Sequence, residues 1–353
     1  MSATTLDHAA RADLDFVLTW RRRWADRIWP VLVEQTDVAT EGNRPADRKA
    51  VTPVAQAQPV YPWFAWSERA SQKALWRAVS DALEGAPAIE LPKDPIGSLT
   101  LDPELKLPEW YTDWDIHVQP GGIWRADASA HVYELGAKLV MLGGNDDYTF
   151  HRAFTETCAG DLGAPARIVD LGCGFGKSTW PFKRAYPDAE VIGVDLAAPC
   201  LRMAHAKTEA LGLAVHYRQA DATVNTGLEA GTADFVASTM VIHELPQPAL
   251  RGIFAEAARL LKPGGRLAFL DFQFMGDPMR DLAAVEHGAR NNEPFMPGMM
   301  ASDTVAMARE AGFAHAAWTA FDERGAGRLP ELAWPKRREW HFPWAVLEAE
   351  MPK

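Results

Sequence analysis

The chain has 353 residues, of which 48% are hydrophobic, and a formal net charge of −11 at pH 7. This length is sufficient for two hydrophobic cores. Because the acidic balance opposes binding to a phosphate backbone, we expect neither DNA nor RNA as a substrate.

Targeting signals and metal-binding patterns are not apparent in the sequence. The first ten residues lack a basic cluster followed by an apolar core, and no run of about 18 apolar residues occurs. The three cysteines, Cys158, Cys173 and Cys200, are too few and too widely spaced for a metal site or a disulfide framework. We therefore predict a cytoplasmic protein with no metal and no membrane partner.

The first 145 residues are predicted to be mainly helical and rich in tryptophan. Apolar residues recur at three- and four-residue steps from Asp13 to about Glu34, which predicts a first helix, and a second is expected from about Trp63 to Glu84. The triplet Arg21-Arg22-Arg23 in the first helix is interpreted as a solvated face. Residues 39–62 are polar and dotted with proline, so they predict a linker or loop.

A mixed segment follows from Tyr111 to Trp124, with aromatic residues, two carboxylates, His117 and a Pro-Gly-Gly turn. Such a mixture is expected where a loop lines a pocket. A surface loop pinned by buried tryptophans explains it equally well. Two further helices are predicted, from about Asp127 to Leu142 and from Asp146 to Cys158.

The most informative segment is Arg167 to Thr179, which reads RIVDLGCGFGKST. A short apolar strand runs into three glycines at alternate positions, Gly172, Gly174 and Gly176, and then into a helix. Glycines supply positive φ and leave backbone N–H groups accessible beside a helix N-terminus. The segment therefore predicts a site for a cofactor that carries a nucleoside.

Spacing disfavours two of the three site types that share this outline. A phosphate-binding P-loop needs a glycine where Leu171 stands. A dinucleotide fingerprint needs its third glycine where Lys177 stands. NAD therefore remains a remote alternative, to be distinguished by a binding test.

The third type is the E/D-x-G-x-G-x-G loop of class I methyltransferases that use S-adenosylmethionine, which Asp170 and the three glycines resemble. Four further matches follow in that family's order: the strand Ala189 to Asp195, whose final carboxylate comes 19 residues after Gly176, the strand Ala214 to Arg218 followed by Asp221, the strand Asp234 to Met240, and the turn Lys262 to Gly265. The ordered set supports the resemblance better than any single match.

The resemblance implies roles for individual residues. Asp195 accepts hydrogen bonds from both ribose hydroxyls, Asp221 receives the adenine amino group, and Tyr133 and Arg152 are candidates to reach the methionine carboxylate. The cofactor-binding residues implied in this way are Asp170, Gly172, Gly174, Gly176, Asp195, Leu196, Asp221, Ala222 and Thr239. Taken singly, Asp195 could be a helix cap and Asp221 a turn residue.

Candidate catalytic residues follow the strand Asp234 to Met240, which resembles the fourth strand of the methyltransferase family. Ligands of parallel α/β sheets lie outside the carboxyl ends of the strands, so His243 and Glu244 are expected to face the transferred methyl group. A similar His-Glu pair occurs in ubiquinone- and menaquinone-type methyltransferases, a local resemblance. His243 or His117 is predicted as a general base, since imidazole titrates near neutrality. Alternatively, Glu244 and Pro246 simply begin the next helix.

The remaining sequence completes the predicted sheet. Residues Glu286 to Met300, which include Asn291, Asn292 and Glu293, are expected to be either an acceptor-binding insertion or an ordinary connecting loop. A helix from about Ser302 to Gly312 follows, and strands near His315 to Phe321 and Trp340 to Leu347 are expected to form the final antiparallel pair.

These observations predict an α/β protein with a Rossmann-like seven-stranded sheet. A helical region, residues 1–145, would cover the acceptor site of a methyltransferase domain, residues 146–353. The resemblance implies methyl transfer from S-adenosylmethionine to an O, N or C atom of a small molecule by in-line displacement. The alternatives are a cyclase-type enzyme or a scaffold that binds the same cofactor. The sequence leaves the oligomeric state open, a homo-oligomer included.

Overall fold

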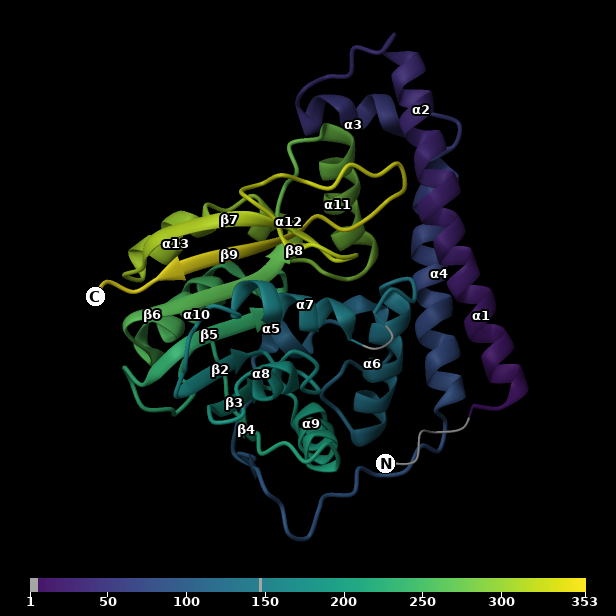
Figure 1. Ribbon diagram of the computed structural model, residues 1–353. Helices are drawn as coiled ribbons and strands as arrows, with labels where there is room; N and C mark the ends of the chain where they lie inside the picture. Colours follow the sequence, from purple (N-terminus) through teal and green to yellow (C-terminus); the bar gives the residue numbers. More distant parts are fainter. Residues whose placement is uncertain (1–5, 146–147) are drawn as a thin grey trace.

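The computed structural model describes residues 6–145 and 148–353 (Figure 1). Within them, nine strands form one sheet in the order β1-β4-β3-β2-β5-β6-β9-β7-β8. The strands are β1 (Ser98–Thr100), β2 (Arg167–Leu171), β3 (Glu190–Asp195), β4 (His216–Gln219), β5 (Ala233–Thr239), β6 (Leu261–Phe272), β7 (Ala314–Asp322), β8 (Gly327–Arg328) and β9 (Trp344–Glu350). Strands β1 to β6 run parallel, and β9 is antiparallel to both β6 and β7.

The predicted Rossmann-like sheet is confirmed, but its strand count is nine rather than seven. The seven expected strands form the continuous centre from β4 to β7, and a short strand is added at each edge. Strand β1 pairs with β4, and the two-residue β8 pairs with β7. Neither short strand has the length or the apolar alternation by which a strand is normally recognised in sequence.

The central strands form because their sequences suit burial on both faces. Strands β2 and β5 are buried along almost their whole length, as expected for parallel strands covered by helices. Four helices contact strands of the sheet (Figure 1): α8 (Thr179–Ala185), α9 (Ala198–Ala210), α10 (Gln247–Leu260) and α13 (Thr304–Glu310). The resulting core contains fully buried aromatic side chains such as Phe182, Phe235 and Phe269.

The N-terminal helices form one flank of the molecule. Helix α1 (His8–Arg23) continues through a π-helical turn, Trp24–Ile28, into α2 (Trp29–Ala39), and α4 (Tyr61–Ala82) runs beside α1 (Figure 1). Both predicted helices are thus present.

The prediction of a linker or loop over residues 39–62 is wrong for the middle of that range, where the helix α3 (Arg48–Gln56) lies. Asp47 caps this helix by accepting hydrogen bonds from the backbone N–H groups of Lys49 and Ala50, and Val51 and Ala55 are buried. The proline at position 53, which suggested a loop, is accommodated within the helix.

Three short elements and one longer helix connect this flank to the sheet. They are α5 (Glu109–Thr112), the 3-10 turn Ile116–Val118, α6 (Asp127–Val140) and α7 (Thr149–Cys158). Helix α6 contacts α4 on one side and α9 on the other, so it joins the two parts of the fold. The prediction for α7 began at Asp146, which lies outside the described residues.

After β6, the segment expected to be an insertion or a loop is mostly helical. Helix α11 (Pro278–Arg290) extends into it, and α12 (Met296–Met300) closes it. Among the described helices, none combines the length and apolar character needed to cross a membrane.

Candidate cofactor and acceptor site

The glycine loop after β2 has the backbone conformation that its sequence predicts. Gly172, Gly174 and Gly176 all have positive φ, at 73°, 52° and 81°. At Gly172 a Cβ atom would lie 2.4 Å from a methyl group of Val241, closer than real Cβ contacts allow. Glycine at this position therefore both permits the turn and allows the approach of the segment after β5.

Replacing Gly172 by alanine is expected to destabilise the fold by more than backbone strain alone. A suitable control is Gly163→Ala, because Gly163 has a similar φ of 72° with open space around its Cα. The control should cost about 1 kcal/mol, and Gly172→Ala a further 1 to 3 kcal/mol from overpacking against Val241. Urea unfolding of both variants measures the difference, and equal losses would contradict the steric argument.

A hollow, here called the loop hollow, lies beside the glycine loop at the carboxyl ends of β2, β3 and β5. Seven of the nine predicted cofactor residues line it, and so does Glu244: the seven are Gly172, Gly174, Asp195, Leu196, Asp221, Ala222 and Thr239. Side chains from α5 and α6, Tyr111 and Tyr133, line it from the helical region. The structure thus brings these residues together at one edge of the sheet.

Asp195 ends β3 with its carboxylate held by backbone groups. One oxygen accepts a hydrogen bond from Gly174 N at 2.8 Å, and the other accepts one from Ala197 N at 2.8 Å. Burial raises the pKa of Asp195 to about 6. Because each carboxylate oxygen can accept more than one hydrogen bond, the group can also receive two neighbouring hydroxyls.

Asp170 and Gly176 lie behind the loop and do not line the hollow. Asp170 is fully buried, and one of its oxygens accepts hydrogen bonds from the hydroxyls of Ser178 and Thr179, both at 2.7 Å. At Gly176 a Cβ atom would lie 2.7 Å from the Tyr217 hydroxyl. Both residues therefore shape the loop, and neither has direct access to a ligand in the hollow.

The other wall of the loop hollow suits an adenosine group. Asp221 accepts hydrogen bonds from Thr223 N at 2.8 Å and from the Thr223 hydroxyl at 2.6 Å. Leu196 and Ala222 add apolar surface. The buried hydroxyls of Tyr111 and Thr239 have no hydrogen-bond partner in the described part of the chain, so polar groups remain for a ligand to satisfy.

A second hollow, here called the chamber, lies between the helical region and the sheet. Its lining includes Arg21, Gln72, Trp76, His117, His151, His243, His287, Glu293, Phe272, Phe342 and Trp344. Three residues, Tyr133, Lys177 and Met240, line both hollows. The two hollows therefore meet at these side chains.

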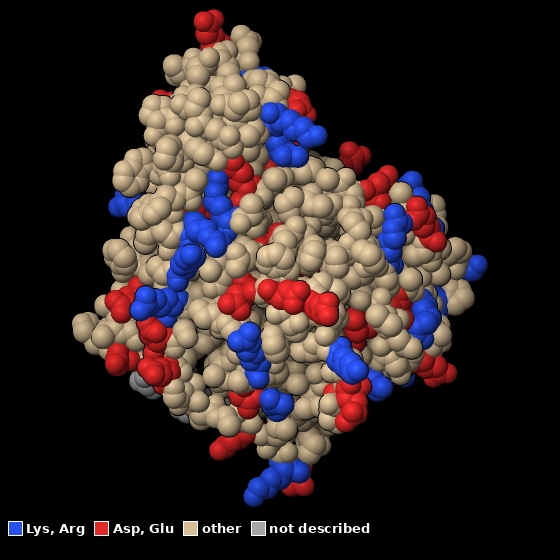
Figure 2. All heavy atoms as spheres, turned by 180° about the vertical axis from the view of Figure 1, so that it is seen from behind, with Lys and Arg blue, Asp and Glu red and all other residues tan. Residues whose placement is uncertain are grey.

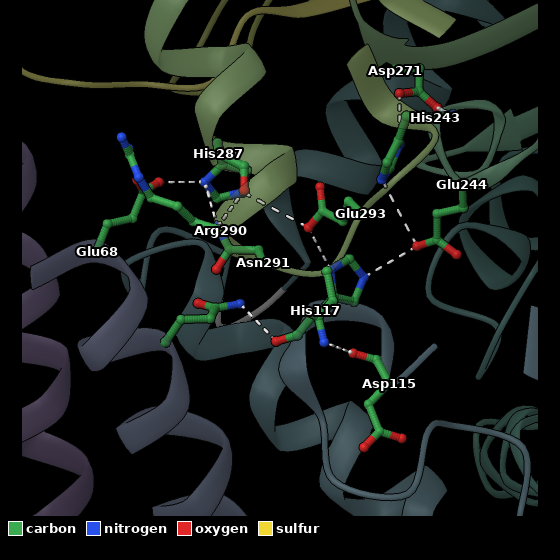
Figure 3. Close-up of polar contacts among 12 residues, drawn as sticks. Glu68, Asp115, His117, His243, Glu244, Asp271, His287, Arg290, Asn291 and Glu293 are labelled. Carbon is green, nitrogen blue, oxygen red and sulfur yellow. Dashed lines mark hydrogen bonds and ion pairs between the residues drawn. The ribbon is translucent and has the colours of Figure 1, made fainter. Parts of the chain in front are cut away.

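His243 faces the chamber and is held from behind by Asp271 at the end of β6 (Figure 3). His243 Nδ1 lies 2.7 Å from Asp271 Oδ1, and both residues are buried. Burial disfavours the charged ring, but Asp271 and Glu244 outweigh it and raise the pKa of His243 to about 9.

His117 lies between two carboxylates (Figure 3). Its Nε2 is 3.2 Å from Glu244 Oε1 and its Nδ1 is 2.9 Å from Glu293 Oε1. Burial opposes the charge, but these hydrogen bonds raise the pKa of His117 to about 10. Glu244 also lies 3.8 Å from His243 Nε2, so the three predicted catalytic residues are neighbours. The sequence-based expectation of imidazoles that titrate near neutrality does not describe these two histidines.

Three site residues were missed or misinterpreted from sequence. Asp271 follows the apolar run of β6, and the same carboxyl-end argument could have identified it. Lys177 was considered only as a break in a dinucleotide fingerprint. Arg21 was assigned to a solvated face, which is wrong: Arg22 and Arg23 are exposed, but Arg21 is only 7% exposed. Within the described residues, no group of three or more potential ligands could hold a metal ion.

Comparison with known proteins agrees with the family resemblance found in the sequence. The family model described as a methyltransferase domain matches residues 168–265. A demethylmenaquinone methyltransferase of Thermus thermophilus is 38% identical over 109 residues, which are 31% of this chain and 48% of that protein. A trans-aconitate 2-methyltransferase of Methylobacterium nodulans is 33% identical over 159 residues, 44% of this chain and 57% of that protein.

The chain spans about half the length of these curated relatives. Among solved structures, phosphoethanolamine N-methyltransferase 2 of Haemonchus contortus in complex with S-adenosyl-L-methionine has a TM-score of 0.46 at 16% identity, over 65% of this chain and 58% of that one. The glycine loop, the sheet order and the family match agree: residues 168–265 match a methyltransferase domain and resemble the class I, S-adenosylmethionine-dependent type.

Proposed function

We propose that the protein transfers a methyl group from S-adenosylmethionine to an O, N or C atom of a small-molecule acceptor by in-line displacement. The observation that carries the proposal is the meeting of the two hollows at Tyr133, Lys177 and Met240. A cofactor in the loop hollow and an acceptor in the chamber would have their reacting ends at this junction.

The chain's own residues would mainly bind and align the two molecules. Asp195, Asp221 and the glycine loop would hold the adenosine part, and Tyr133 is in reach of the remainder. When bound, S-adenosylmethionine supplies a methyl group on an already activated sulfonium. Alignment of this kind lowers the barrier by about 7 to 11 kcal/mol in favourable cases. A general base typically accelerates a reaction about 100- to 10,000-fold, which corresponds to the smaller value of roughly 3 to 5 kcal/mol.

His243 is the group proposed to take a proton when the acceptor must lose one. Asp271 fixes the orientation of its ring through Nδ1, which leaves Nε2 as the atom that faces Glu244 and the chamber. The proton would then reside on His243 Nε2, stabilised by the nearby carboxylate of Glu244. Glu244 is proposed to support that charge, and His117, which lies 3.2 Å from Glu244, to hold this carboxylate in place.

Several features support a small molecule as the acceptor. The curated relatives are named for unlike acceptors, a menaquinone precursor and trans-aconitate, so the acceptor must be inferred from the chamber itself. On the face shown in Figure 2, acidic and basic side chains are interspersed, and neither sign covers a large continuous area. This pattern and the net charge of −11 are unfavourable for nucleic acid. A cytoplasmic location, and the division into a helical cover up to residue 145 and a methyltransferase domain beyond it, remain part of the proposal.

Calorimetric titration tests the cofactor assignment. S-Adenosylmethionine and S-adenosylhomocysteine should bind with Kd values of about micromolar, corresponding to roughly −8 kcal/mol, and NAD should not bind. Incubation with methyl-labelled cofactor and candidate acceptors should then give labelled product. Binding of the cofactor without transfer to any acceptor would favour the scaffold or cyclase alternative, and binding of NAD alone would refute the proposal.

A further inference from the structure

The charged groups around the chamber are almost all paired. His243 pairs with Asp271 and His117 with Glu293, as described above. His287 Nδ1 lies 2.7 Å from Glu68 Oε1, and Arg290 also pairs with Glu68 at 2.6 Å (Figure 3). In this set each imidazole lies beside a carboxylate, although His287 shares Glu68 with Arg290.

Two basic side chains of the chamber, Arg21 and Lys177, have no ion-pair partner among the described residues, and burial lowers the pKa of Arg21 to about 10 and that of Lys177 to about 8. Among the described residues, the guanidinium of Arg21 donates its only hydrogen bond to the neutral amide oxygen of Gln72. Glu68 is near enough to favour the charge of Arg21 but is itself bonded to His287 and Arg290. The ammonium of Lys177 lies over the rings of Tyr133 and Phe175, at 5.5 and 5.4 Å, and no carboxylate of the described residues is bonded to it. A buried charge without a counter-charge is costly.

Unsatisfied hydrogen-bond donors gather in the same chamber. Arg21 Nε, Trp76 Nε1 and His151 Nε2 are buried without a partner in the described structure, and their residues are 7%, 0% and 1% exposed. His151 Nδ1 lies 3.1 Å from the amide nitrogen of Asn145, which can only donate, so Nε2 is the atom that carries the proton.

The surplus of donors has a simple chemical meaning. Among the described residues that line the chamber, Glu293 Oε2 is the one buried side-chain acceptor that also lacks a partner. Each buried donor left unsatisfied costs about 1 to 3 kcal/mol. The three donors, one of them on the guanidinium of Arg21, together with the ammonium of Lys177 are compensated best by a ligand that brings negative charge and several acceptor atoms.

Another part of the chamber's lining is apolar. Phe272 and Trp344 are stacked at 4.5 Å between ring centroids, Phe342 packs on both, and Val140 and Met141 complete this wall. The cavity volume of the chamber is about 70 Å³, below the usual range for small-molecule sites, so a bound acceptor must also occupy the adjoining loop hollow or displace lining side chains.

We propose that the acceptor is a small molecule with an anionic carboxylate-type group on an apolar or aromatic body, and that Arg21 binds the anion while Trp76 and His151 donate to it. This inference rests on the proposed function. The apolar body would lie against Phe272, Phe342 and Trp344, and the atom to be methylated would face Met240, where the two hollows meet.

Lys177 lines both hollows, so its ammonium group can bind a carboxylate from either of two sources. One source is the acceptor, and the other is the methionine part of the cofactor. Arg21 lines only the chamber, so its effect should be confined to the acceptor. The substitution Lys177→Gln separates the sources: weaker binding of S-adenosylhomocysteine assigns Lys177 to the cofactor, and weaker binding of carboxylate probes alone assigns it to the acceptor.

The test compares aromatic carboxylates with their neutral amides on the full-length protein saturated with S-adenosylhomocysteine. The probes are benzoate, phenylacetate and indole-3-acetate, each with its primary amide, and the readout is the Kd from calorimetry or ligand-observed NMR. In the unmodified protein at least one carboxylate should bind about 10- to 100-fold more tightly than its amide, as expected for hydrogen bonds to a charged group. Arg21→Gln should remove this preference and leave the affinity for S-adenosylhomocysteine unchanged.

A matched control is Arg23→Gln, since Arg23 lies two residues away on α1 and is exposed. It should keep the carboxylate preference. The proposal is overturned when no carboxylate binds more tightly than its amide, or when the variants at Arg21 and Arg23 behave alike. The carboxylate-amide comparison needs no variant, so it decides the matter even where Arg21→Gln fails to fold. Failure of S-adenosylhomocysteine to bind the unmodified protein would instead refute the proposed function.

Discussion

Asp195→Ala is expected to weaken the binding of S-adenosylhomocysteine at least about 100-fold, because two hydrogen bonds from the ribose to a charged acceptor are lost at about 1.5 to 3 kcal/mol each. The substitution also frees the N–H groups of Gly174 and Ala197, which the carboxylate now orients. Calorimetric titration of the folded variant measures the loss.

The control for this prediction is Asp188→Ala, since Asp188 is an exposed aspartate shortly before β3 and has no role in the hollow. It should bind normally. The raised pKa of Asp195, about 6, adds a pH dependence. As the pH falls below about 6 the carboxyl group gains a proton and loses acceptor strength, so the affinity of the unmodified protein should fall. Normal binding by Asp195→Ala would show that the ribose lies elsewhere.

His243→Ala is expected to lower turnover by about 100- to 10,000-fold, the range typical of general-base catalysis, and to leave cofactor affinity unchanged. With a pKa of about 9, His243 is almost fully protonated at pH 7, when only about 1% of it can accept a proton. The rate of the unmodified enzyme should therefore rise about tenfold per pH unit from pH 7 towards 9. An activity independent of pH over this range would exclude His243 as the base.

Asp271→Asn separates the positioning role of Asp271 from a merely structural one. The amide cannot stabilise the imidazolium as the carboxylate does, so the pKa of His243 should fall and the pH–rate profile should shift to lower pH by about one to two units. For the substitution His243→Ala described above, a matched control is His8→Ala, at an exposed position on α1. A drop in rate at every pH without a shift of the profile would indicate that Asp271 only maintains the fold.

The methyltransferase core could be predicted from sequence because each of its signals is local. The apolar run from Glu190 to Asp195 predicts a strand, and the carboxylate at its end is predicted to lie where the carboxyl ends of the parallel strands meet. The glycine loop likewise requires backbone conformations that few residues other than glycine adopt. These features depend on neighbours within a few positions, so a single sequence is sufficient.

The chamber could not be predicted because its residues come from distant parts of the chain. Arg21, Trp76, His117, His243 and Glu293 belong to five separate elements or loops. Nothing local distinguishes Arg21 from its neighbours Arg22 and Arg23; packing of α1 against α4 is what buries it. The shifted pKa values of His117 and His243 have the same origin, since the carboxylates responsible are brought close by tertiary structure.

The short strand β1 has a consequence for the integrity of the whole sheet. Its three residues pair in parallel with β4, and Ser98 Oγ lies 2.9 Å from His216 Nδ1 beside that pairing. Strand β4 would otherwise present unpaired N–H and C=O groups along its outer side, which is a template for association with another chain. Residues 98–100 lie within the first 145 residues, so removal of that part of the chain would make β4 the edge strand and expose its unpaired backbone groups. With β1 in place, only a three-residue strand forms this edge of the sheet.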